Sequence, residues 1–323
     1  MGRRVLAVAV IAFAIAAVLF PSAATAAFPG KNGRIAYVGA PAGGFQFDIF
    51  TVRPKGSGLR QLTDDPIEEF DPSWSADGRR LVFTRFEPAG STVFTINADG
   101  GDPTRVVDDA GEPSFSPSGR RIVYTTGDSI RTVRPDGTKP RRLLGAHPRG
   151  GLGSPQYSPS GRRIVFDGRP RRKPEQGIWT MRRDGSRLRQ LIVHRPPSLE
   201  RKTPIEKTPD YSPDGRHIVI CHGCATGDGV IRRMRADGSN RRRVLRADDE
   251  AAGPAYAPDG ERIAVSIGTV GVAPGGLTLQ SCSDLYTVSP TGSDRERLTH
   301  WCGSDGVGGH VFSPSWQPLR RSR

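Results

Sequence analysis

The sequence predicts an all-β protein: a six-bladed β-propeller of four-stranded antiparallel blades, closed by the C-terminal strand joining the N-terminal blade. Two interleaved repeats and two complementary fragments at the ends of the repeat region indicate this fold. The composition agrees with it, because the 323-residue chain contains 40 glycines and 28 prolines and is 35% hydrophobic. So many turn-forming residues disfavour a helical bundle, while the apolar content can still supply a core.

The first 26 residues are expected to form a secretory signal peptide. Arg3 and Arg4 precede an uninterrupted apolar run, Val5–Phe20, which is shorter than the roughly 20 residues that span a bilayer. Residues 24–26, Ala-Thr-Ala, then fit a cleavage site. A retained membrane anchor is the alternative. After cleavage, residues 27–323 would form a single domain without stable membrane insertion, secreted or associated with the cell envelope.

The first repeat joins an aromatic strand, a tight turn and an apolar strand. Its five copies begin at residues 71, 112, 154, 208 and 253 and read DPSWSADGRRLVF, EPSFSPSGRRIVY, SPQYSPSGRRIVF, TPDYSPDGRHIVI and GPAYAPDGERIAV. The central glycine of each copy, with the Asp or Ser before it, is typical of a β-hairpin turn. The spacing of most copies is close to the roughly 40–50 residues of a propeller blade.

The second repeat supplies the other half of each blade. It consists of a turn, most often Asp-Gly, between an apolar strand and a strand that ends in Leu-Thr or a similar pair. The six turn glycines are Gly56, Gly100, Gly137, Gly185, Gly238 and Gly292. Because the two repeats alternate, each unit is expected to contain four strands.

The two ends of the repeat region complement each other. Residues 33–38 (GRIAYV) form the second strand of a blade without its first strand, and residues 312–316 (FSPSW) form a first strand without its second. A ring in which the last strand completes the first blade explains both fragments. Second strands such as IVY and IVF are apolar on both faces, so a neighbouring blade is expected on each side of them.

These repeats resemble those of the TolB-like six-bladed propellers, and the resemblance covers residues 28–318. Such propellers serve as protein-docking rings in the Tol envelope system, as gating domains of prolyl-oligopeptidase-type peptidases and as stand-alone secreted proteins. Here the repeats begin at Gly33, without the α/β domain that precedes the TolB propeller, and the chain ends seven residues after the closing strand. The resemblance therefore implies a stand-alone secreted member.

The basic charge does not by itself identify a partner. The formal net charge is +14, but only six of the 47 basic residues are lysine, a bias that genome base composition can produce. Nucleic acid is the usual partner of so basic a chain. The export signal and the lack of a basic motif with interleaved aromatic residues argue against it. An acidic envelope polymer or an anionic membrane surface remains an alternative to a protein partner.

Binding is expected on the face of the ring that carries the variable connections, because the hairpins on the other face are short and nearly constant. The candidate residues on this face and at the channel mouth are Asp71, Glu112, His194, His300, Trp301 and His310. Asp71 and Glu112 begin adjacent inner strands, where carboxylates could hold a cation or simply be solvated. A glycine-rich loop is expected from Ser266 to Ser283. No metal or cofactor is predicted.

The four cysteines favour disulfides, because their number is even and the chain is expected to be exported. A bond between Cys282 and Cys302 would tether two long loops. Cys221 and Cys224 form a C-x-x-C sequence, which fits a small disulfide loop or an oxidoreductase pair. Zinc is disfavoured because no two further ligands lie nearby in the sequence.

The function expected from the sequence is that of a non-enzymatic module. The catalytic signatures G-x-S-x-G, H-E-x-x-H and G-x-G-x-x-G do not occur. The sequence therefore favours an exported propeller that acts as a protein-binding scaffold in the cell envelope or extracellular space. The alternative is a small-molecule hydrolase or dehydrogenase that uses a cation or cofactor at the channel mouth.

Overall fold

The computed structural model describes residues 28–319 except for 42–43, 45, 149, 174, 195–205, 225–228, 247–250, 273–278 and 303–307. The expected signal peptide, residues 1–26, lies outside these ranges. Within them, no helix is long and apolar enough to cross a membrane.

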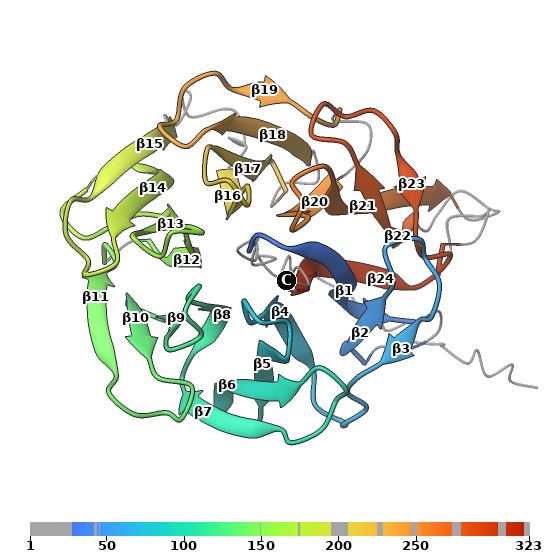
Figure 1. Ribbon diagram of the computed structural model, residues 1–323, viewed down its shortest axis with the longest axis horizontal. Coiled ribbons are helices and arrows are strands. Elements are labelled where there is room, and N and C mark those ends of the chain that lie inside the picture. Colours follow the sequence, from blue (N-terminus) through green and yellow to red (C-terminus); the bar gives the residue numbers. More distant parts are fainter. Residues whose placement is uncertain are drawn as a thin grey trace, which may run out of the picture.

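Six four-stranded antiparallel sheets surround a central axis as the blades of a propeller (Figure 1). Blade 1 contains β24 (His310–Leu319), β1 (Lys31–Ala40), β2 (Asp48–Val52) and β3 (Arg60–Gln61). Blade 2 contains β4 (Glu69–Trp74), β5 (Arg80–Glu87), β6 (Gly90–Asn97) and β7 (Thr104–Asp108). Blade 3 contains β8 (Gly111–Phe115), β9 (Ile122–Thr126), β10 (Ser129–Val133) and β11 (Arg141–Gly145).

The other half of the ring repeats this arrangement. Blade 4 contains β12 (Leu152–Tyr157), β13 (Arg163–Gly168), β14 (Gln176–Arg182) and β15 (Arg189–His194). Blade 5 contains β16 (Glu206–Tyr211), β17 (His217–His222), β18 (Val230–Arg235) and β19 (Arg242–Arg243). Blade 6 contains β20 (Ala251–Tyr256), β21 (Ile263–Val272), β22 (Leu279–Val288) and β23 (Glu296–Arg297). The predicted six-bladed propeller is thereby confirmed.

The ring is closed as the sequence predicted. β24 pairs with β1 in antiparallel register, with Ile35 opposite Trp316 and Ala40 opposite His310. Both Ile35 and Trp316 are buried. Because the first and last strands share one sheet, the two ends of the chain are held together by the same ladder that stabilises every other blade.

The core lies between neighbouring blades rather than within a single sheet. For example, Val82 and Val93 of blade 2 pack in one hydrophobic cluster with Phe115 and Tyr124 of blade 3. Second strands carry apolar side chains on both faces because each blade is covered on both sides. This confirms the interpretation of the IVY and IVF segments.

Each inner strand contains a bulge at the residue before its proline. These residues have a left-handed backbone: Asp71 (φ 57°), Glu112 (φ 50°), Ser154 (φ 48°), Thr208 (φ 52°), Gly253 (φ 57°) and Ser313 (φ 49°). The register of each inner strand with its neighbour shifts at this point. A non-glycine residue in this conformation costs roughly 1–2 kcal/mol, so other interactions must hold it there.

Contacts to the preceding blade hold three of these bulges. The backbone N–H of Glu112 donates to Thr84 Oγ1 at 3.1 Å, and that of Ser154 donates to Glu112 Oε2 at 2.9 Å. The N–H of Thr208 donates to Asp167 Oδ2 at 3.3 Å. We call these three contacts interblade latches, because each joins one blade to the next near the central axis.

The two ends of the blades form the two faces of the ring. The hairpin face carries the turns between first and second strands, at 75–79, 116–121, 158–162, 212–216 and 257–262. The loop face is the opposite end, where second strands end and third strands begin. The expected glycine-rich loop from Ser266 to Ser283 is wrong in extent. β21 and β22 stay paired as far as Val272 and Leu279, because β-branched side chains continue the strand pattern.

Candidate functional site

The two carboxylates expected at the channel mouth accept hydrogen bonds from neighbouring blades, and that of Glu112 is part of an interblade latch. Asp71 is only 6% exposed, and its Oδ1 accepts a hydrogen bond from Ser313 Oγ at 3.5 Å. Glu112 is partly buried, and its Oε2 accepts from the Ser154 N–H and from Thr125 Oγ1 at 3.2 Å. Among the described residues, no group of three or more His, Cys, Asp or Glu side chains is placed to hold a metal ion. These carboxylates therefore act as hydrogen-bond acceptors between blades.

The pKa of Glu112 is strongly raised. Burial is the largest cause, and the nearby carboxylates of Asp71 and Asp167 add to it, so that the pKa reaches about 8. The Ser154 N–H and Lys207 oppose the shift without cancelling it. A carboxyl group with this pKa is mostly protonated at neutral pH.

Glu112→Gln is expected to stabilise the protein at alkaline pH. Because the folded-state pKa lies above the usual value of about 4.5, the wild type loses stability as pH rises towards 8 and Glu112 loses its proton. Glutamine cannot ionise, yet its oxygen can accept the same hydrogen bonds. The melting temperatures of the variant and wild type should be similar at pH 5, with the variant higher by about 3 °C or more at pH 9.

A matched control is Glu261→Gln, which removes a carboxylate from an exposed turn. Its melting temperature should follow that of the wild type across the pH range. A Glu112→Gln variant that tracks the wild type in the same way would contradict the assignment of a protonated Glu112 with a raised pKa.

The other candidate residues of the sequence analysis are only partly brought together. His194 ends β15 in blade 4, and its side chain lies outside the described part of the structure. His300 is exposed. Trp301 and His310 both lie at the junction of blades 6 and 1. Trp301 packs edge-on against Phe50, with ring centroids 5.1 Å apart.

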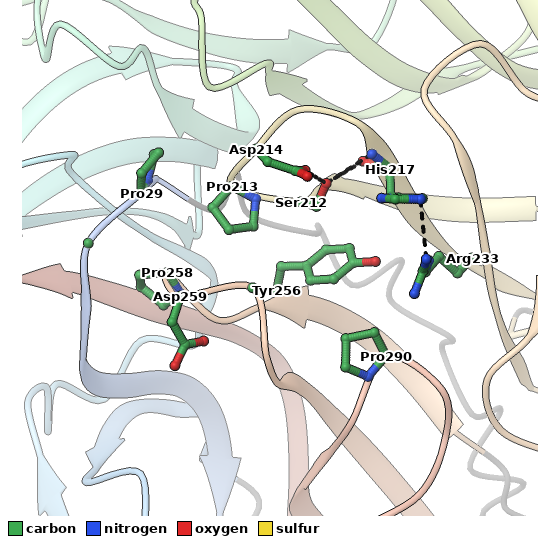
Figure 2. A pocket seen from close by; sticks show the side chains of 12 residues that line it. Pro29, Ser212, Pro213, Asp214, His217, Arg233, Tyr256, Pro258, Asp259 and Pro290 are labelled. Carbon is green, nitrogen blue, oxygen red and sulfur yellow. Dashed lines mark hydrogen bonds between the residues drawn. The ribbon is translucent and has the colours of Figure 1, made fainter.

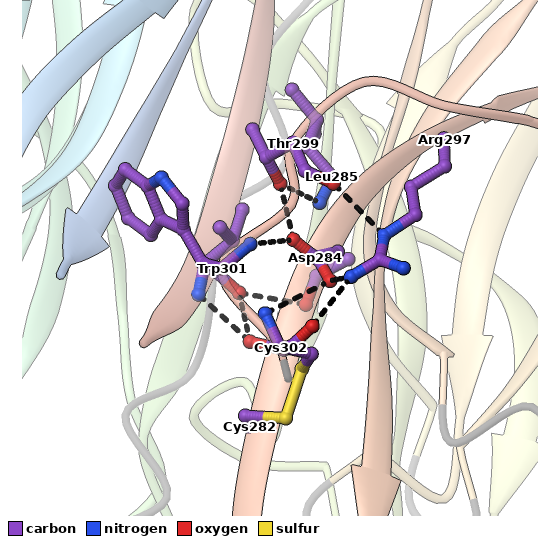
Figure 3. Close-up of a disulfide and its surroundings, with 10 residues drawn as sticks. Cys282, Asp284, Leu285, Arg297, Thr299, Trp301 and Cys302 are labelled. Carbon is purple, nitrogen blue, oxygen red and sulfur yellow. Dashed lines mark hydrogen bonds and ion pairs between the residues drawn. A yellow bond between two sulfur atoms is a disulfide. The ribbon is translucent and has the colours of Figure 1, made fainter. Parts of the chain in front are cut away.

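A disulfide and a buried carboxylate fix this junction (Figure 3). Cys282 and Cys302 are bonded to each other, as predicted, with Cα atoms 5.5 Å apart. Asp284, which is 1% exposed, lies beside the disulfide and accepts hydrogen bonds from several groups of the returning chain. These are Thr299 Oγ1 at 2.7 Å, the Trp301 N–H at 2.8 Å, the Cys302 N–H at 3.3 Å and Arg297 Nη2 at 2.5 Å. The arrangement holds Trp301 against blade 1.

The second predicted cysteine pair is also present. Cys221 and Cys224 are bonded as a disulfide, with Cα atoms 5.9 Å apart. Their sulfur atoms lie 3.4 Å and 3.2 Å from the Ala251 carbonyl oxygen of blade 6. The small disulfide loop therefore packs against the neighbouring blade, and the described residues include no free cysteine.

A row of aromatic rings on the loop face was not expected from the sequence. It runs from His310 to Phe312, Phe47, Phe70 and Phe86, with successive centroids 5.9, 5.8, 5.5 and 5.3 Å apart. We call these five residues the aromatic row. Phe86 is 42% exposed, whereas Phe70 is buried beneath the surface. The exposed Asp64 and Asp65 lie in the connection that leads into blade 2.

A cavity of about 940 Å³ lies on the hairpin face between blades 5 and 6 (Figure 2). Its lining includes Ser212, Asp214, His217, Arg233, Tyr256 and the four prolines Pro29, Pro213, Pro258 and Pro290. A neighbouring cavity of about 440 Å³ shares His217, Arg233 and Pro290 and adds Asn240, Arg242, Arg243 and Thr291. We call the two together the blade 5–6 groove. From the sequence, binding was expected on the other face.

Three residues of this groove have the side chains of a catalytic triad but not its hydrogen bonds. Ser212 Oγ donates to Asp214 Oδ1 at 2.6 Å and accepts from the backbone N–H of His217 at 2.9 Å. The imidazole of His217 instead lies 3.2 Å from Arg233. Nucleophilic catalysis requires the serine hydroxyl to contact the imidazole itself. Ser75 and Asp77 form the same bond in blade 2 at 2.7 Å, so this is a turn motif of the repeat.

Comparison with known proteins finds similarity to TolB, over a short segment in sequence and over most of the chain in fold. No family model matches the chain. TolB of the Tol-Pal system from Francisella tularensis is 42% identical over 67 residues, which is 20% of this chain and 15% of that protein. The crystal structure of TolB from Acinetobacter baumannii superposes with a TM-score of 0.68 at 18% identity, covering 90% of this chain and 68% of that one. The chain has a propeller fold similar to that of TolB.

Other similarities are to proteins of different kinds. A putative TolB from Agrobacterium tumefaciens has a TM-score of 0.61 at 18% identity, covering 88% of this TolB-like propeller and 99% of that chain. Dipeptidyl-peptidase 5 from Porphyromonas gingivalis is 31% identical over 96 residues, 28% of this chain and 14% of that protein. The sequence matches to TolB and to dipeptidyl-peptidase 5 cover only about one seventh of those proteins, so they show similarity over short segments alone.

Proposed function

We propose that this TolB-like propeller is an exported, non-enzymatic module that binds a protein of the cell envelope or extracellular space through its loop face. The aromatic row is the observation that carries the proposal. Aromatic side chains are enriched at protein–protein interfaces, where rigid rings bury large areas at low entropic cost. The similarity to a Tol-Pal system protein supports a role in the envelope, and the expected signal peptide at residues 1–26 supports export.

The surroundings of the row indicate the chemistry of the partner. Phe86 offers an exposed apolar contact and Asp64 supplies exposed negative charge, while Asp65 is ion-paired with Arg85. Arg85, next to Phe86, is paired with the buried carboxylate of Glu69 at 2.6 Å, so part of its charge is already neutralised. A partner segment that carries an apolar side chain next to lysine or arginine would match this surface.

Photo-crosslinking in the native cells tests this proposal. A benzophenone amino acid at position 86 should link the propeller to one partner, and the link should be lost when Phe312→Ala shortens the row. The same amino acid at position 120, on the hairpin face, is the matched control and should give no such product. Failure to form any product at position 86, or equal products at both positions, would contradict binding by the loop face.

A further inference from the structure

Blade 5 departs from the other blades at two positions that contact each other. The first departure is at the residue that directly precedes the apolar residues of the second strand. Five blades have arginine there: Arg34, Arg80, Arg121, Arg163 and Arg262, whereas blade 5 has His217. The second is in the third strand, five residues before the turn glycine. Five blades have threonine there: Thr51, Thr95, Thr132, Thr180 and Thr287, whereas blade 5 has Arg233.

In the other blades the arginine spans the outer part of the blade. Arg34 Nε donates to Thr51 Oγ1 at 2.9 Å, which joins the two positions directly. Arg121 Nη1 donates to the Lys139 carbonyl in the turn between third and fourth strands at 2.7 Å. Arg80 lies 5.7 Å from the ring centroid of Phe115 in the next blade. In blade 2 the long side chain therefore reaches into the crevice towards the next blade.

Blade 5 cannot fill its crevice in this way. Histidine is shorter than arginine, and the His217 imidazole lies against Arg233 at 3.2 Å. Tyr256 stands in blade 6 at the position equivalent to Phe115 and lines the open space (Figure 2). The blade 5–6 groove is thus located where the repeat pattern is broken.

The broken pattern also concentrates positive charge. Arg233 faces Arg242 directly across β18 and β19, and Arg232 faces Arg243. Like charges at directly opposite positions destabilise a sheet. Arg233, Arg242 and Arg243 all line the outer part of the groove. An anion bound there would offset their mutual repulsion.

The inner part of the groove has a different character. Four proline rings and the Tyr256 ring provide apolar surface. The two carboxylates of this part are engaged in their own turns, since Asp214 accepts the Arg216 N–H at 3.0 Å and Asp259 accepts the Glu261 N–H at 2.9 Å. The groove therefore combines a cationic outer end with an apolar inner end.

We propose that the blade 5–6 groove binds a small organic anion. Its phosphate or carboxylate group contacts Arg233, Arg242 and Arg243, and its apolar body lies against the prolines and Tyr256. Arginine binds such groups through paired N–H donors, and a cavity of about 940 Å³ is within the size range of small-molecule sites. This site is separate from the loop face, so it does not depend on the proposed protein partner.

Titration calorimetry with phenyl phosphate tests the proposal. Phenyl phosphate should bind more tightly than inorganic phosphate, which has the charge without the apolar body. The double variant His217→Arg with Arg233→Thr gives blade 5 the arginine–threonine pair of the other five blades, so it should fold normally without changing the formal charge. It should bind phenyl phosphate at least about tenfold more weakly.

A second variant shows whether weaker binding could come from misfolding of the double variant. Arg243→Gln alters one exposed side chain of the groove, and it should weaken binding several-fold while leaving the circular dichroism spectrum unchanged. The proposal would be overturned if the wild type did not bind phenyl phosphate, if inorganic phosphate bound equally well, or if the double variant kept the wild-type affinity. None of these results bears on crosslinking at position 86, so the two proposals can fail separately.

Discussion

Asp284→Ala is expected to lower the free energy of unfolding by about 3–5 kcal/mol, because it removes the shared acceptor of three buried or partly buried donors and the carboxylate that pairs with Arg297. Asp284 is almost fully buried and accepts four hydrogen bonds from the segment that holds Trp301 (Figure 3). Loss of this carboxylate should release Trp301 from its place against Phe50. The damage would therefore reach the junction of blades 6 and 1.

Chemical denaturation monitored by tryptophan fluorescence measures this loss. The matched control is Asp128→Ala, which also removes an aspartate paired with an arginine, Arg142, at 3.2 Å. Both partners of that pair are largely exposed, so the control should change the free energy of unfolding far less than Asp284→Ala does. Equal losses in the two variants would show that Asp284 does not organise the junction.

The fold could be predicted because the signal is repeated. A single DPSWSADGRRLVF segment would indicate only a hairpin, but five copies of it and six copies of the second turn specify identical units that must pack on one another. The closure of the ring was predictable for a similar reason: the fragments around Ile35 and Trp316 are each incomplete in a way that the other completes. Register and bulges required the structure, because they depend on contacts between blades.

The roles of the predicted site residues were harder to derive. The sequence placed Asp71 and Glu112 at equivalent inner positions, and Glu112 indeed lies near enough for the Asp71 carboxylate to raise its pKa. Glu112 accepts a hydrogen bond from the backbone N–H of Ser154, a residue with a left-handed backbone. The sequence did not predict this backbone conformation. The interblade role of Glu112 is therefore a consequence of tertiary structure.

The aromatic row and the blade 5–6 groove differ in how far the sequence could predict them. The aromatic row takes one or two residues from each of several distant segments, so no local pattern reveals it. The blade 5–6 groove did leave a signal in the sequence, since GRHIV stands where other repeats have GRRIV, GRRLV or GERIA. Only the contact between His217 and Arg233 shows that this change and the loss of a threonine belong together.

Thermal unfolding of a chain that ends before His310 tests the central claim, that the ring is closed by β24. This truncation removes the buried Trp316 and the whole ladder with β1. It should abolish the cooperative transition or lower its midpoint by more than about 10 °C, and a synthetic peptide of residues 308–319 should restore part of the loss. Leu319→Ala, which alters a side chain that is 41% exposed, should have little effect. An unchanged midpoint in the truncated chain would contradict the closed ring.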